Sequence, residues 1–107
     1  MIMVTSESVP GRSQTSTLGI VRGSAVRARH LGKDVLALFK NIVGGELEEY
    51  TKLLAESREQ ALDRMVAQAR TLGADAIVGI RFTSSEIAKG AAEVLVYGTA
   101  VKLDRPS

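Results

Sequence analysis

The side chains that could do chemistry in this chain carry oxygen and nitrogen, because its 107 residues include no cysteine and one histidine. The missing cysteines exclude disulfides, thiol nucleophiles, iron–sulfur clusters and thiolate metal sites. His30 and Asp34, four residues apart, could form half of a metal site, but structural sites use four protein ligands and catalytic sites three. We therefore expect no metal or cofactor, and interpret His30 as a surface residue. A metal site at His30 stays possible in one arrangement, in which copies of His30 from several subunits converge on the axis of a ring.

Acidic residues repeat at helical spacing in the middle of the chain. Glu59 lies one helical turn from both Glu56 and Asp63. Two buried acids on one face could do acid–base chemistry, since each raises the pKa of the other. Arg58 and Arg64 are interspersed with these acids, however, which favours a solvated polar face.

One basic cluster occurs in the first half of the chain: Arg22, Arg27, Arg29 and Lys33. The formal net charge is +2, and aromatic residues make up 4% of the sequence. A nucleic-acid surface is typically a basic stripe with interleaved aromatics, so nucleic acid is not the expected partner. A small-molecule or anionic ligand at the cluster stays open as a hypothesis, above all if the cluster is repeated around a ring.

The Gly44-Gly45 pair before a helical pattern could form a backbone nest for an anion. Glu46, Glu48 and Glu49 would place negative charge at that position, so we interpret the pair as a tight turn. No set of nucleophile, base and orienting group can be recognised in the sequence, which favours a protein without catalytic activity.

Apolar spacing predicts two helices. The first runs from Gly32 to Ile42, where the apolar residues fall on one face: Val35, Leu38, Phe39 and Ile42. The second runs from Glu46 to Leu72, which holds a broad apolar stripe and no Gly or Pro, and Gly73 is placed to end it. A helix of that length spans about 40 Å, more than a small domain is wide, so part of it is expected to pack on another subunit.

Four strands are predicted, at Met1–Val4, Leu18–Val26, Ala76–Phe82 and Val94–Leu103, with connections at Thr5–Thr17 and Ser84–Ala92. The last strand is apolar on both faces, with Val94, Val96 and Ala100 on one and Leu95, Tyr97, Val101 and Leu103 on the other. A strand with one solvated face would alternate with polar residues. We therefore expect a second copy of the chain to cover one of these faces.

The element order β-β-α-α-β-β predicts an α+β fold, with two helices packed on a mainly antiparallel sheet. The length fits one domain over residues 1–107. No signal peptide and no apolar run long enough to span a membrane are recognised, so a soluble cytoplasmic protein is expected.

Several blocks of the sequence are found together in one family: Asn41-Ile42-Val43-Gly44-Gly45, Arg58-Glu59-Gln60-Ala61, the run from Ala69 to Ile80, and Gly98-Thr99-Ala100-Val101. With these blocks, the chain from about Val4 to Leu103 resembles the YbjQ-like family of small uncharacterised proteins, which carries a heavy-metal-binding label. The resemblance implies an α+β subunit that assembles into a pentameric ring. The label fits this chain badly, because soft heavy metals prefer thiolates.

Tyr50, Arg58 and Asp75 match the pattern of that family and are polar residues next to the predicted core. They are the candidates for a ligand-binding or interface role, and none is assigned a catalytic one. The sequence therefore favours a non-catalytic homo-oligomer that acts as a scaffold or binds a small ligand between subunits. The alternative is a metal-ion binding protein that uses oxygen and histidine ligands in place of cysteine.

Overall fold

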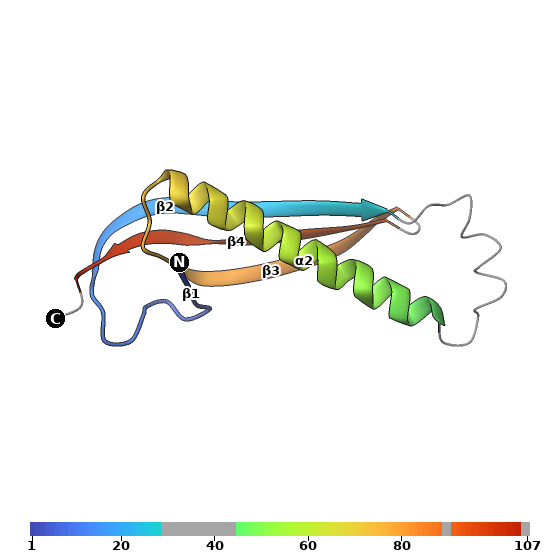
Figure 1. Cartoon of the computed structure of the whole chain (residues 1–107), viewed down its shortest axis with the longest axis horizontal. Coiled ribbons are helices and arrows are strands. Elements are labelled where there is room, and N and C mark those ends of the chain that lie inside the picture. Colours follow the sequence, from blue (N-terminus) through green and yellow to red (C-terminus); the bar gives the residue numbers. More distant parts are fainter. Residues whose placement is uncertain (29–44, 89–90, 106–107) are drawn as a thin grey trace.

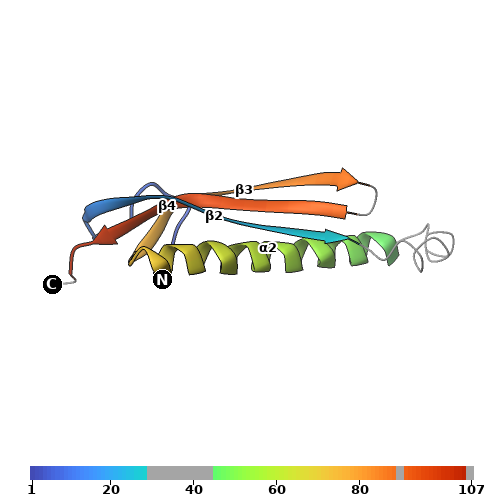
Figure 2. The ribbon, with the colours of Figure 1, turned by 90° about the horizontal axis from the view of Figure 1, so that it is seen from above.

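The computed structural model of the chain describes residues 1–28, 45–88 and 91–105. One long helix, α2 (Gly45–Thr71), packs on one side of a four-stranded sheet (Figures 1 and 2). The strands are β1 (Ile2–Met3), β2 (Gln14–Ala28), β3 (Ala76–Ala88) and β4 (Ala91–Leu103). The predicted helix from Gly32 to Ile42 lies outside the described residues, as do His30 and Gly44.

The sheet has the strand order β1-β3-β4-β2. β4 pairs antiparallel with both β2 and β3, whereas the short β1 pairs parallel with the start of β3 through Ile2 and Met3. The α+β class is thus confirmed, and the sheet is mixed, with two antiparallel pairs and one short parallel pair. β2 forms one edge of the sheet along its whole length.

The second predicted helix is confirmed to within one residue at each end. It ends as expected at Gly73, which has a φ of 75°, a left-handed conformation that glycine adopts without a steric cost. The N–H of Gly73 donates to the carbonyl of Arg70, and the N–H of Ala74 to the carbonyl of Ala69. These two bonds satisfy carbonyls that the end of the helix would otherwise leave without a partner.

Three strands are longer than predicted: β4 begins at Ala91 rather than Val94, and the additions to β2 and β3 are rich in hydroxyl residues. β2 begins at Gln14 rather than Leu18, and β3 continues to Ala88, so the predicted connection over Ser84–Ala92 is wrong. Thr83 to Ala88 pairs with Leu95 to Ala91 of β4. The hydrogen bonds between β3 and β4 satisfy the backbone N–H and C=O groups of this segment, and this outweighs the preference of serine for turns.

The main core lies between α2 and the strands β2, β3 and β4, and its fully buried residues include Val21, Met65, Ile77, Val94 and Val96. Gly23 lets the helix approach, because a Cβ built there would lie 2.0 Å from the carbonyl oxygen of Ala61. The predicted apolar stripe of the helix is therefore the face that the sheet covers.

A second, smaller core lies on the opposite face of the sheet, near the end where β1 pairs. Ala76, Val78, Val101 and Leu103 are buried there beneath Val4 and Val9 of the N-terminal segment. Part of the second apolar face of β4 is thus covered by the chain itself, which the sequence interpretation had assigned wholly to another copy. The same N-terminal segment donates the N–H of Val4 to the carbonyl of Ile77 at 3.0 Å.

Candidate functional site

Asp75 links three parts of the fold at one end of the sheet. Its Oδ2 accepts the backbone N–H of Leu103 at 2.9 Å, and its own N–H donates to the carbonyl of Val101 at 2.9 Å. Its carbonyl oxygen accepts the N–H of Ile2 at 3.3 Å. The side chain thus joins the turn after α2 to the last strand, a positioning role for this candidate residue.

The other two candidates lie on α2 and are not brought together with Asp75. Arg58 is exposed, in the middle of the helix. It lies 13 residues before Thr71, the last residue of the helix, which corresponds to about 20 Å along the axis. Tyr50 belongs to the first turns of α2, and its side chain lies outside the described part of the structure. A single site made of all three residues is therefore not what the fold presents.

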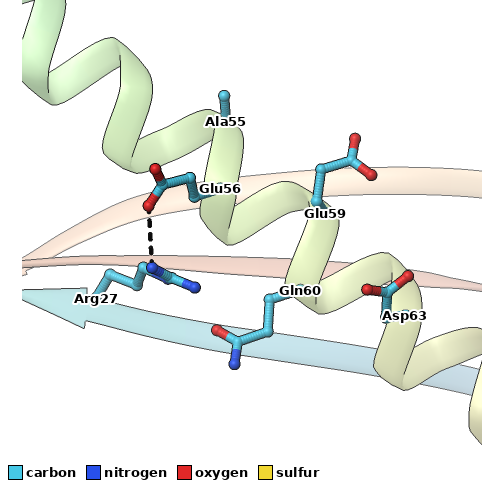
Figure 3. A pocket seen from close by; sticks show the side chains of 6 residues that line it. All are labelled: Arg27, Ala55, Glu56, Glu59, Gln60 and Asp63. Atoms are coloured by element: carbon cyan, nitrogen blue, oxygen red, sulfur yellow. Dashed lines mark hydrogen bonds and ion pairs between the residues drawn. The ribbon is translucent and has the colours of Figure 1, made fainter.

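An open groove of about 470 Å³ runs along α2 beside the end of β2 (Figure 3). It is lined by Arg27, Ala55, Glu56, Glu59, Gln60 and Asp63. Arg27 Nη1 donates to Glu56 Oε2 at 3.0 Å, and both side chains remain partly exposed. The other two carboxylates point away from this ion pair in Figure 3.

The acids of the groove, Glu56, Glu59 and Asp63, are exposed to solvent. This supports the interpretation of a solvated polar face. Within residues 1–28, 45–88 and 91–105, no three His, Cys, Asp or Glu side chains are grouped so that they could hold a metal ion.

The predicted basic cluster is divided by the sheet. Arg27 lies opposite Ala92 on the face that carries α2, whereas Arg22 lies opposite Tyr97 on the other face. Arg27 is also paired with Glu56. The two described arginines therefore do not form one positive surface, and Arg29 and Lys33 lie outside the described residues.

The side of the sheet away from α2 has an apolar surface that we call the open face. Its apolar residues are Ile20 and Val26 on β2 and Leu95 and Tyr97 on β4, and the polar Arg22 and Ser24 lie between Ile20 and Val26 on the same face. Ile20 is 76% exposed, Val26 55% and Tyr97 40%. In Figure 2 the N-terminal segment (blue) lies on this side only near the end of the sheet that holds the second core.

Sequence reasoning recognised the two-faced β4 but missed Ile20 and Val26 of the open face. The signal is strand alternation: Val21, Gly23 and Ala25 face the helix, so Ile20 and Val26, at the two ends of this run, face away from it.

None of the helices in the described part of the chain is long and apolar enough to cross a membrane.

The chain is similar over nearly its whole length to several proteins. A family model described as "Putative heavy-metal-binding" matches residues 1–104. A UPF0145 protein of Archaeoglobus fulgidus is 56% identical over 103 residues, which cover 96% of this chain and 95% of the relative. Another, from Fervidobacterium nodosum, is 56% identical over 107 residues and covers 100% of this chain and 99% of its own.

A solved structure shares the fold. It is a protein of unknown function of the DUF74 family from Pediococcus pentosaceus, with a TM-score of 0.61 and 17% sequence identity. The match covers 97% of this chain and 98% of that one. Because the identity is low, this likeness speaks for the arrangement of the helix and strands alone. The whole-length match to the family model and the relatives above half identity lead to one conclusion: this chain belongs to the YbjQ family of uncharacterised UPF0145 proteins.

Proposed function

We propose that this protein is a non-catalytic homo-oligomer, a ring of five subunits, that acts as a scaffold or holds a small ligand where subunits meet. The observation that carries the proposal is the open face. Ile20, Val26 and Tyr97 lie on one side of two neighbouring strands and are each at least 40% exposed. Large apolar side chains gathered on one surface of a small protein are typical of an interaction site.

The dimensions of the subunit support the same proposal. Its radius of gyration is 17.8 Å and its longest axis is 59 Å. A compact domain of this length has a radius of gyration of about 13 Å. An elongated subunit leaves more of its sheet uncovered than a compact one, and contact with further copies would cover it.

The charged groups of the described residues favour binding over catalysis. The acids of the groove are exposed, Arg27 is paired with Glu56, and Asp75 is engaged with the backbone of Leu103. An enzyme site typically brings a base and an orienting group together in a cleft that excludes water. The open groove on α2 offers no such exclusion.

Native mass spectrometry of protein purified from its own cells tests this proposal. We expect a mass of five subunits, and any ligand held between subunits would add to that mass. Size-exclusion chromatography with light scattering provides an independent measurement. A monomer at micromolar concentration would refute the ring.

A second candidate function is metal-ion binding, which the description of the family model favours. Heavy metals that prefer thiolates do not fit this chain, because it has no cysteine. The candidate is therefore restricted to ions that accept oxygen and imidazole ligands, with His30 as the one imidazole available. Titration calorimetry with Ni²⁺ and Zn²⁺ separates the two functions, since His30→Ala should abolish uptake. Equal uptake by both proteins, or none by either, would remove the candidate.

A further inference from the structure

The outer edge of β2 exposes backbone groups that another strand could pair with. β2 is the last strand in the order β1-β3-β4-β2, so one side of it faces no strand within the described residues. An unpaired row of N–H and C=O groups is a template for strand addition, and proteins commonly block it. The question is therefore what occupies these groups here.

Two side chains of α2 reach this edge. Gln68 Oε1 accepts the backbone N–H of Arg22 at 2.7 Å, and Arg64 Nη1 donates to the carbonyl oxygen of Ser24 at 2.5 Å. Figure 1 shows the C-terminal half of α2 lying over β2. The helix thus occupies one donor and one acceptor of the strand that it covers.

The two bonds fall on alternate residues of the strand. Residues two apart in a strand direct their backbone groups to the same side, so Arg22 and Ser24 both present theirs to the same edge. Arg22 and Ser24 lie opposite Tyr97 and Leu95 of β4, but their N–H and C=O groups point away from β4, and the residues that alternate with them bond to it. A strand that added at this edge would need the positions that Gln68 and Arg64 hold.

The other edge of the sheet offers a strand that could add there. β1 pairs with β3 only at Ala76 and Ile77, and the N-terminal segment reaches β3 as far as Ile80 and Arg81. From Phe82 to Ala88, no strand of the described residues lies on the outer side of β3. A chain with two different open edges can join head to tail, and such contacts give fibres when they do not close.

We infer that Arg64 and Gln68 form an edge lock, which keeps β3 of a second copy from pairing with β2. The lock acts on the free edge of the sheet and not on the open face, so it goes beyond the proposed ring. It limits self-association to contacts other than edge-to-edge pairing at Arg22 and Ser24.

The test is the double variant Arg64→Ala/Gln68→Ala, compared with wild type by light scattering over a range of concentrations. We expect the weight-average mass to rise about twofold or more above that of wild type, because pairing of two particles through one edge doubles the mass. The mass should keep rising with concentration as further copies add. Hydrogen exchange should show new protection over Phe82 to Ala88. Because each mass is compared with wild type, the result is independent of whether wild type is a ring.

The matched control is Gln60→Ala/Arg70→Ala, which removes the same two residue types from the same helix and should keep the wild-type mass. Gln68→Glu retains the acceptor oxygen, so alone it should also keep that mass. If the double variant folds poorly by circular dichroism, the single variants Arg64→Ala and Gln68→Ala are used, each with a smaller rise expected. The inference is overturned if folded lock variants keep the wild-type mass, or if the control rises equally.

Discussion

At the scale of single residues, Gly23 determines how closely α2 approaches the sheet. A Cβ at this position would lie 2.0 Å from the carbonyl oxygen of Ala61 and 2.6 Å from the amide nitrogen of Met65. Both atoms belong to the helix backbone, which cannot turn away as a flexible side chain could. The contact between helix and strand therefore requires the missing side chain.

Gly23→Ala should lower the free energy of unfolding by about 3 kcal/mol, since overpacking typically costs 1–3 kcal/mol and here the obstacle is backbone. Urea denaturation followed by circular dichroism measures this. Ser24→Ala is the control, because Ser24 is exposed and its carbonyl contact is retained. Equal stability of Gly23→Ala and wild type would mean that the helix does not approach so closely.

Asp75 could be selected from the sequence as a candidate functional residue, but its hydrogen-bond partner could not be predicted. The sequence marks Asp75 as a candidate for ligand binding or for an interface, whereas in the structure its carboxylate accepts the N–H of Leu103 in a distant strand. Contacts between residues 28 positions apart cannot be read from local spacing. The residue could therefore be named from the sequence, whereas its partner, Leu103, is known only from the structure.

Asp75→Ala should destabilise the protein by about 1–2 kcal/mol, as expected for a hydrogen bond with a charged acceptor that is only partly buried. Asp75→Asn retains a carbonyl oxygen as acceptor and should lose less. Thermal and urea denaturation of the three proteins give the comparison. An alanine variant as stable as wild type would leave the ligand-binding role as the better interpretation of Asp75.

At the scale of elements, α2 was the most predictable part of the fold. Its apolar stripe, the absence of Gly and Pro and the terminating Gly73 are all local features, and they give Gly45–Thr71 almost without error. The strands were less predictable, because the hydroxyl residues from Thr83 to Ser85 become strand only through pairing with β4. Such pairing depends on residues distant in sequence.

Among the side chains of α2 that the structure describes, Met65 is the largest that is fully buried, and it lies in the core between helix and sheet. Met65→Ala should lower the free energy of unfolding by about 2–5 kcal/mol, because it leaves a cavity. Val66→Ala, at a half-buried position beside it, should cost clearly less. Denaturant unfolding of both variants tests whether α2 rests on the sheet through the predicted face.

At the scale of the whole molecule, the open face is the feature that bears on whether the subunit is a monomer or associates with further copies. The sequence predicted an uncovered apolar surface from β4, and the structure places Ile20 and Val26 of β2 beside it. The share of that face covered by the N-terminal segment could not be predicted. Val4 ends the first predicted strand, and Val9 lies in a stretch whose polar residues and Pro10-Gly11 indicate only a loop.

Ile20→Lys should weaken self-association about tenfold or more, since leaving a large apolar side chain out of an interface forfeits about 1.5–3 kcal/mol. Light scattering over a dilution series measures the shift in the dissociation midpoint. Ala67→Lys adds the same charge at an exposed position of α2 and is the control. An unchanged midpoint for Ile20→Lys would place the subunit contact elsewhere.

Both ends of the chain are fastened at the same end of the sheet. The N–H of Ile2 and the N–H of Leu103 both donate to Asp75, and Arg12 donates to Asp104 (Figure 1). A short peptide linker could therefore join the two termini, and the chain could be reopened elsewhere as a circular permutant. Fluorescent proteins fused to the two termini would for the same reason sit close together, so energy transfer between them would report on folding without a probe inside the subunit.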